Sequence, residues 1–256
     1  MEINKELSEK PLISIIMPSY NSQIFIEKSI LAILNQTYTN WELLITDDCS
    51  NDATYEIIRR YELIDKRIKV FRLNRNLGAG MARNHSIMNS NGQFIAFCDS
   101  DDKWDSIKLE KQIHFMIEND ISFSYSDYSL INENDELIGE RKSPLKVNYN
   151  DMLLNNYIGC LTAVYDVRKL GKIYMKDIKN RQDWLLWLEI LKKTDYAYNV
   201  GEPIAYYRER GDSISANKFK MIKYNWRIYR EYEGFSFINS SFYIIRYLFM
   251  YLKKVI

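Results

Sequence analysis

The first hundred residues repeat one pattern, in which a short apolar strand is followed by a polar loop and then by a helix. Predicted strands cover 12–17, 41–46, 68–73 and 94–98, and helical spacing of apolar residues follows in 25–34, 52–61 and 82–88. Repeated β-α units of this length predict a mainly parallel sheet with right-handed crossovers. Ligand-binding loops are then expected at the carboxyl ends of the strands. The class is therefore α/β.

The second half of the chain is less regular. It predicts helices at 105–119 and 183–193, a strand at 122–128, a hairpin at 131–141 and a strand at 161–166. Short strands at 196–200 and 204–208 are expected to complete a mixed, antiparallel edge. We expect one domain over 1–217, with halves at about 12–116 and 117–217, and a separate helical tail over 218–256.

Three carboxylates in four residues follow the predicted strand 94–98 directly, in the run Asp99-Ser100-Asp101-Asp102. These charges repel one another, and a divalent cation held together with a diphosphate fits them, because hard cations take oxygen ligands. With only His85 and His114 in the chain, a nitrogen-rich zinc site is not expected. The alternative is that Asp102 or Asp105 caps the next helix, which requires one acid rather than three.

Other loops at the same edge carry further candidates. Asp47-Asp48 can accept hydrogen bonds from a ribose or base, or can simply form a turn. Tyr20 can cover a base with its ring, or can pack beneath its loop. The Gly78–Gly80 segment allows close backbone approach before a helix in which Arg83 can reach a phosphate.

Asp183 opens a predicted helix in the second half. Transfer of a sugar to a hydroxyl needs a carboxylate that accepts the hydroxyl proton, and Asp183 is the best-placed candidate, although an acid there can also be a helix cap. Downstream, Arg208 and Arg210 can neutralise charge on a departing diphosphate or pair with surface acids.

Charge and cysteine content narrow the class of protein. The net charge of +1 argues against a nucleic-acid partner. The segment 218–256 holds eight Lys or Arg, two Glu and many aromatic residues, which favours contact with an anionic membrane surface. Packing on the domain or a dimer contact are the alternatives. Cys49, Cys98 and Cys160 form no close pair, so we expect buried thiols in a reducing cytosol, with neither a signal peptide nor a membrane span.

Taken together, these motifs resemble the family 2 glycosyltransferases of the GT-A fold. The matching segments in the nucleotide half are 15–21, 36–38, 41–45, 47–52, 78–84 and 97–104. Segments 158–162, 169–172 and 181–184 resemble bacterial enzymes of capsule, lipopolysaccharide or teichuronic-acid assembly. The resemblance implies a nucleotide-diphospho-sugar transferase fold, with a mainly parallel sheet, a mixed acceptor-side half and C-terminal helices.

The resemblance also implies the chemistry. It predicts an inverting, metal-dependent hexosyltransferase that uses a nucleotide sugar, usually UDP-linked, with Mn²⁺ or Mg²⁺. The acceptor is expected to be a glycan or lipid-linked glycan, and the enzyme to be peripheral on the cytoplasmic face of the inner membrane, in contact through 218–256. The implied nucleotide-binding residues are Pro18, Tyr20, Asn21, Asp48, Arg83, Asp99, Ser100 and Asp101. The implied metal ligands are Asp101 and Asp102, the base is Asp183, and the leaving-group or acceptor side holds Trp184, Arg208 and Arg210.

Two positions depart from the family pattern. Gln182-Asp183 stands where many relatives have Glu-Asp, which keeps the aspartate. Arg210 stands where many have a histidine, and an arginine can supply charge but cannot ligate a cation. The remaining alternatives are a sugar nucleotidyltransferase, which needs a Gly-rich basic loop that 18–21 does not provide, and an inactive homologue that only binds sugar nucleotide.

Overall fold

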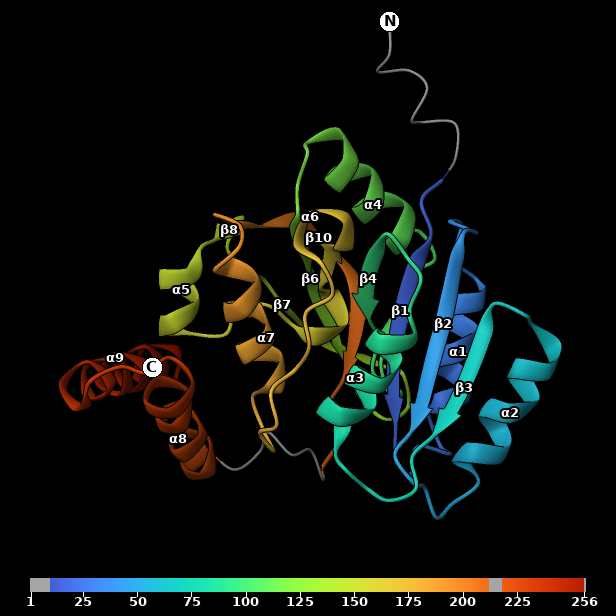
Figure 1. Cartoon of the computed structure of the whole chain (residues 1–256), viewed down its shortest axis with the longest axis horizontal. Helices are drawn as coiled ribbons and strands as arrows, with labels where there is room; N and C mark the ends of the chain where they lie inside the picture. Colours follow the sequence, from blue (N-terminus) through green and yellow to red (C-terminus); the bar gives the residue numbers. More distant parts are fainter. Residues whose placement is uncertain (1–9, 212–217, 256) are drawn as a thin grey trace, which may run out of the picture.

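The nucleotide half forms the expected parallel sheet. The computed structural model describes residues 10–211 and 218–255. The strands β1 (Ile13–Ser19), β2 (Trp41–Asp47), β3 (Ile68–Arg72) and β4 (Phe94–Phe97) pair in parallel, in the order β3-β2-β1-β4. Their carboxyl ends share one edge, at the bottom of Figure 1. The expectation of a mainly parallel sheet is confirmed.

Helices cover both faces of this sheet and make three layers (Figure 1). On one face α1 (Ile26–Leu34), α2 (Thr54–Ile64) and α4 (Lys108–Glu118) pack on an apolar cluster that includes Ile13, Leu43 and Ile113. The second face carries α3 (Ala79–Asn89), α5 (Tyr149–Leu154) and α7 (Gln182–Leu191) over another cluster. Alternating strand side chains feed the two clusters, because each parallel strand is buried on both faces.

The acceptor half extends the same sheet in mixed directions. It contributes β5 (Lys103–Trp104), β6 (Phe123–Ile131), β7 (Leu137–Arg141), β8 (Lys146–Val147), β9 (Val164–Asp166) and β10 (Ala197–Arg208), together with the short helices η2 (Cys160–Thr162) and α6 (Val167–Leu170). β9 pairs antiparallel with β4 and with β6, which joins the two halves in one sheet. The hairpin expected at 131–141 is present as the antiparallel pair of β6 and β7.

One expected feature is wrong in part. Residues 196–208 do not form two short strands at an edge; they form the single strand β10, which lies between β6 and β5. β10 runs parallel to β6 but pairs antiparallel with β5 and β8, so the mixed character expected here is present. The two predicted segments join because the chain stays extended through Gly201 and Pro203, where the pairing with β6 shifts register at a bulge.

The C-terminal segment is helical and packs on the domain. It contains α8 (Lys218–Arg227), the π-helical turn η4 (Ile228–Tyr232) and α9 (Phe237–Val255). The Tyr229 ring is buried, lies edge-on to Trp184 at 6.1 Å between ring centroids, and its hydroxyl donates to the Leu153 carbonyl at 2.6 Å. In the described part of the chain, every helix falls short of the length and apolar character that crossing a membrane requires.

Candidate active site

Three loops from distant parts of the sequence meet at the carboxyl edge of the sheet. The Ser22 and Ser100 hydroxyls are 2.8 Å apart and link the loops after β1 and β4. Asn21 lies in the left-handed region at φ 47°, where its amide N–H donates to Ser50 Oγ at 3.0 Å and its Oδ1 accepts from the Asn51 N–H. The edge predicted from the strand order is therefore one connected surface.

The two acids after β2 hold the backbone of this edge. Asp47 is buried, accepts from the Ser50 hydroxyl at 2.5 Å and pairs with Arg72 at 3.3 Å. Asp48 is also buried and accepts the backbone N–H groups of residues 77 and 78, both at 2.7 Å. Gly78 has φ 89°, a value that favours glycine. Asp48 therefore fixes the loop that leads into α3.

Tyr20 and Pro18 lie differently at the end of β1. Pro18 is inside the strand, in register with Thr46. Tyr20 follows the strand, and 44% of its surface is exposed at the edge where the loops meet. An exposed aromatic ring can stack on a planar base, whereas the buried Pro18 acts through the path of the backbone.

Arg83 and Asp99 form a partly buried ion pair beside these loops. The guanidinium, on the first turns of α3, donates to Asp99 Oδ1 at 2.5 Å. Burial alone would lower the pKa of Arg83, but the nearby charges of Asp99, Cys160 and Asp183 raise it. Among the described residues, its buried Nε has no hydrogen-bond partner and its Nη1 hydrogen-bonds only to Met175 Sδ, at 4.0 Å. The side chain therefore keeps donors for a further acceptor.

Asp101 and Asp102 carry negative charge that the protein compensates only in part. Burial and the charge of Asp99 raise the pKa of Asp101, against the lowering effect of Arg210. Burial and the charges of Asp101 and Asp99 raise the pKa of Asp102, which accepts the Arg208 N–H at 3.0 Å. Such a pair of hard oxygen donors fits a divalent cation. Within residues 10–211 and 218–255 no three His, Cys, Asp or Glu side chains cluster as metal ligands, so phosphate or water oxygens would have to complete the shell.

The two arginines after β10 differ in exposure. Arg208 is buried, and its guanidinium donates to the carbonyls of Asp101 and Asn132 and to Asp135 Oδ1. Arg208 therefore holds the backbone of the acidic loop 99–102 from the buried side. Arg210 is more exposed, and its Nη1 lies 3.3 Å from Asp101 Oδ2. The arginine at the family's histidine position thus contacts the acid run directly.

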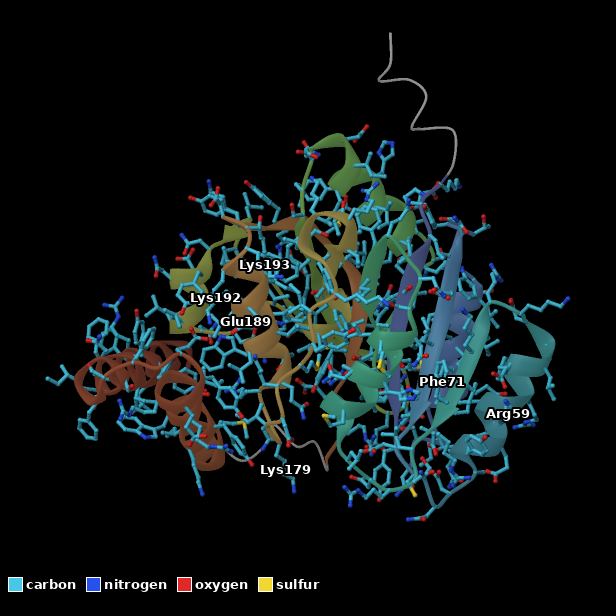
Figure 2. All side chains as sticks on the ribbon, in the orientation of Figure 1. Arg59, Phe71, Lys179, Glu189, Lys192 and Lys193 are labelled. Carbon is cyan, nitrogen blue, oxygen red and sulfur yellow. The ribbon has the colours of Figure 1, made fainter. Side chains whose placement is uncertain are left out.

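Asp183 begins the helix that faces this edge from the acceptor half. Figure 2 marks Lys179 at the lower edge, just before α7, with Glu189 and Lys192 farther along the helix and away from that edge. Arg181, the residue before the helix, has φ 68°, a strained conformation for a residue other than glycine. Asp183 Oδ2 accepts from Asn156 Nδ2 at 2.9 Å. This hydrogen bond fixes one carboxylate oxygen.

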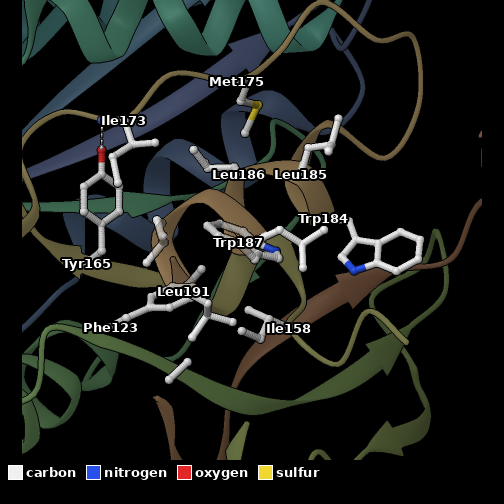
Figure 3. Close-up of a cluster of buried hydrophobic side chains, with 14 of the residues drawn as sticks. Phe123, Ile158, Tyr165, Ile173, Met175, Trp184, Leu185, Leu186, Trp187 and Leu191 are labelled. Atoms are coloured by element: carbon white, nitrogen blue, oxygen red, sulfur yellow. Dashed lines mark hydrogen bonds between the residues drawn. The ribbon is translucent and has the colours of Figure 1, made fainter. Parts of the chain in front are cut away.

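Trp184 lies in the core rather than on the acceptor surface. The indole is fully buried, and its N–H donates to the Met152 carbonyl at 2.7 Å. Figure 3 shows it beside Trp187 and Leu185 in the cluster beneath α7. Contact between the Trp184 side chain and a ligand at the surface is not compatible with this burial. Its position supports the helix that carries Asp183.

Other contacts near these acids carried no signal in the sequence. The Cys160 thiol has a pKa raised by burial and by Asp99, Asp183 and Asp102, and lowered by Arg83, so it lies among these groups. Cys98 is buried as expected, but Cys49 and Cys160 are partly exposed; all three are free thiols. A Cβ on Gly80 would lie 3.0 Å from the Gln182 side chain, so α3 and α7 meet closely at their first turns. Such contacts depend on packing between the halves, which periodicity does not encode.

The chain matches a known family along most of its length. The family model described as "Glycosyl transferase family 2" matches residues 14–166. The chain belongs to glycosyltransferase family 2. It is 43% identical to TuaG of Bacillus subtilis, a glycosyltransferase assigned to teichuronic acid biosynthesis, over 96% of this chain and 98% of TuaG. It is 42% identical to the Escherichia coli enzyme WfgD, named a UDP-Glc:alpha-D-GlcNAc-diphosphoundecaprenol beta-1,3-glucosyltransferase, over 95% and 94% of the two chains.

Solved structures show the same fold at low sequence identity. Residues 1–349 of S. aureus TarS in complex with UDP-GlcNAc superpose with a TM-score of 0.70 at 20% identity, covering 92% of this chain and 71% of that one. The mannosyltransferase PcManGT of Pyrobaculum calidifontis, in complex with GDP-Man and Mn²⁺, gives 0.68 at 14% identity, covering 90% and 66%. The GT-A fold expected for this family 2 glycosyltransferase is confirmed.

Proposed function

We propose that this family 2 glycosyltransferase transfers a sugar, with inversion, from a UDP-sugar to a hydroxyl of a lipid-linked bacterial surface glycan. The observation that carries the proposal is the close approach of α3, which carries Arg83, to the start of α7, which carries Asp183. Arg83 pairs with Asp99 at 2.5 Å. A Cβ on Gly80 of α3 would lie 3.0 Å from the side chain of Gln182, the residue before Asp183, so the two halves present acids to one shared space. A donor-side acid opposite an acceptor-side acid suits transfer of a group between two bound substrates.

On the donor side, we propose that Tyr20 covers the base and that Asn21, Asp48 and Ser100 maintain the loop surface around the nucleoside. Arg83 has donors left for a phosphate or hydroxyl oxygen, and Asp99 can accept from a ribose. The choice of UDP rests on the relatives, since WfgD is named for UDP-Glc and TarS structures hold UDP or UDP-GlcNAc.

On the acceptor side, Asp183 is the proposed general base. Asn156 holds one carboxylate oxygen by donating to it, which leaves the other oxygen to accept a proton from the attacking hydroxyl. Attack from the face opposite the leaving group inverts the sugar carbon. The bond between the sugar carbon and the β-phosphate oxygen breaks and UDP leaves; Arg210 beside Asp101 partly offsets the charge that develops on its diphosphate.

Mn²⁺ or Mg²⁺, held by Asp101 and Asp102 together with diphosphate oxygens, would supply Lewis-acid stabilisation of the leaving group. Burial first, and then the neighbouring acids, raise the pKa values of these two carboxyls, and a cation held between them would offset the cost of keeping both ionised. Arg208 donates its backbone N–H to Asp102 and its Nε to the Asp101 carbonyl, so it keeps both acids in place.

We further propose that the enzyme works at the cytoplasmic face of the inner membrane, where the segment 218–256 meets the lipid. The name of WfgD specifies a diphosphoundecaprenol-linked acceptor, and a lipid-linked acceptor of this kind stays with the bilayer. The basic composition of 218–256 agrees with a place at an anionic surface. Synthesis of capsule, lipopolysaccharide or teichuronic acid would each be consistent with this chemistry.

The test is UDP release by the purified full chain from a panel of UDP-sugars, with a lipid-diphosphate-linked GlcNAc as acceptor, in Mn²⁺ and in EDTA. Asp183→Asn should lower turnover about 10²–10⁴-fold while UDP affinity and thermal stability stay unchanged. Asp177→Asn, an exposed aspartate just before the same helix, is the matched control and should retain full turnover. If Asp183→Asn turns over as fast as the control, Asp183 is not the general base. If EDTA does not weaken UDP binding, Asp101 and Asp102 do not hold a cation that binds the diphosphate.

A further inference from the structure

Helix α9 has apolar residues on two opposite faces. The inner face packs on the domain: Ser240 is fully buried, and the Tyr243 ring stacks on Tyr229 and Phe235 with centroids 5.2 and 5.3 Å apart. The opposite face, called here the outer face, consists of Ile238, Phe242 and Ile245, which recur at spacings of four and three residues. Figure 1 shows α9 at one end of the molecule, with no other element beyond it. The outer face is therefore an apolar surface without a cover among the described residues.

The outer face is strongly exposed. Ile238 is 78%, Phe242 54% and Ile245 65% accessible. Their spacing of four and three residues places them on successive turns of one side of the helix. Single exposed apolar side chains are common, but a contiguous set on one helix indicates a surface that is covered in its working state.

The charges around this face select the kind of surface that covers it. Arg246 lies on α9 with its guanidinium 5.9 Å from the Phe242 ring centroid, and Lys223 and Arg230 are exposed elsewhere in the C-terminal segment. The two acids of the segment are already engaged, because Glu231 pairs with Arg227 and Glu233 pairs with Lys192. An apolar helix face bordered by cations is the arrangement that binds anionic lipid, where the apolar residues enter the interface and the cations meet the headgroups.

The same helix contacts the start of α7, which carries Asp183. Arg181 Nη2 donates to the Tyr247 hydroxyl at 3.2 Å, and the Arg181 guanidinium lies 5.4 Å from the Trp184 ring centroid. Trp184 in turn meets Tyr229 of the C-terminal segment. The position of α9 therefore determines the distance between Asp183 and whatever surface α9 rests on.

We propose that the outer face of α9 docks on an anionic lipid bilayer and so holds the start of α7 beside the membrane. This inference rests on the proposed transfer to a lipid-linked glycan, and it names the surface through which that acceptor is met. A polyprenyl diphosphate lies at the headgroup level, so an enzyme docked on α9 meets its acceptor next to the bilayer without extracting it.

The test is co-sedimentation of the full chain with vesicles of phosphatidylcholine that contain about one third phosphatidylglycerol. The double variant Ile238→Ser/Ile245→Ser should lower the vesicle partition coefficient about tenfold, because two exposed apolar side chains no longer enter the interface. The matched control is Leu63→Ser/Ile64→Ser on α2, where two equally exposed residues lie at the other end of the molecule; it should bind as the native chain does.

Three results would overturn the docking surface. They are equal binding by the two double variants, equal binding to vesicles without phosphatidylglycerol, and a native dimer that Ile238→Ser/Ile245→Ser converts to a monomer without any vesicle affinity. The last result would assign the outer face to a second copy of the chain. Light scattering after gel filtration gives that oligomeric state directly.

A separate measurement keeps this inference distinct from the proposed reaction. UDP release with a water-soluble GlcNAc-diphosphate acceptor should be equal for the native chain and Ile238→Ser/Ile245→Ser, since neither residue contacts the candidate site. Transfer to the same acceptor on a polyprenyl chain in vesicles should fall in that variant alone. Loss of both activities in the native chain would reject the reaction, whereas retained vesicle binding would still support the surface.

Discussion

A buried lysine beneath the acidic loop makes the stability of this protein depend on pH in a defined way. Lys108 on α4 is fully buried, its Nζ donates to Gln112 Oε1 at 2.8 Å, and it lies 4.1 Å from the Trp104 ring centroid. Burial lowers the pKa of Lys108 from 10.5 to about 7. Among the described residues, no carboxylate forms a hydrogen bond or ion pair with the Lys108 ammonium group, so the charged form is costly there.

The magnitude follows from the two pKa values. Between about pH 7 and 10.5 the unfolded chain binds a proton at Lys108 that the folded chain does not, so the free energy of unfolding rises with pH in this window. The ionisation term disfavours the folded state by about 5 kcal/mol at pH 6 and by about 2 kcal/mol at pH 9. Lys108→Met removes the term. Its effect on stability should therefore be more favourable at pH 6 than at pH 9, by about 3 kcal/mol.

The difference between the effects of Lys108→Met at pH 6 and at pH 9 does not depend on the hydrogen bond that the substitution removes. Methionine leaves Gln112 Oε1 without its donor, at a cost of about 1–3 kcal/mol, but that cost is the same at both pH values. The assay is urea unfolding followed by circular dichroism at pH 6 and pH 9 for the native chain, Lys108→Met and the exposed Lys66→Met control. The control should shift stability equally at the two pH values. A Lys108→Met effect that is independent of pH, or larger at pH 9, would refute the reasoning.

Three further predictions concern the candidate site. Asp48→Ala should destabilise the fold by about 3 kcal/mol or more and weaken UDP binding, because two backbone N–H groups lose a charged acceptor. Urea unfolding measures the stability and UDP titration the affinity; an unchanged urea midpoint would contradict the structural role of Asp48. Asn156→Ala should lower kcat about tenfold without changing the KM for the donor, because the Asp183 carboxylate loses the hydrogen bond that holds it. Asn155→Ala is the neighbouring control; an equal loss of kcat in both variants would indicate a general structural effect. Gly80→Ala should lower turnover through its close approach to Gln182, and Gln182→Ala in the same chain should restore it; failure of this rescue would show that the contact is not the cause.

Much of the nucleotide half was predictable, because its signals are local. The period of apolar residues identifies each strand and helix, and parallel β-α units bring the carboxyl ends of the strands to one edge. The acids after β2 and β4 therefore gather as expected. The partners of those acids were not predictable from the sequence. Asp48 takes two backbone N–H groups, whereas Asp101 meets Arg210, and both outcomes depend on loops from elsewhere in the chain.

The acceptor half shows the same limit at the level of whole elements. Residues 196–208 read locally as two short strands, and only the pairing with β6, β5 and β8 makes them one strand inside the sheet. Trp184 follows Asp183 directly, yet its indole is buried in the core, where Figure 3 shows it with Trp187 and Leu185. Helical periodicity predicts that the side chains of consecutive residues point in different directions. It does not predict which of them faces the core.

The sequence by itself determined the order of strands and helices in the first hundred residues, the edge at which the acids lie and the family, because those follow from periodicity, strand ends and local motifs. Only the tertiary structure decided that Asn156 holds Asp183, that Arg83 lies under the influence of acids from both halves, and that α9 buries one apolar face while exposing the other. These features join residues far apart in the chain. They arise when layers pack against each other, and no local pattern of residues specifies that geometry.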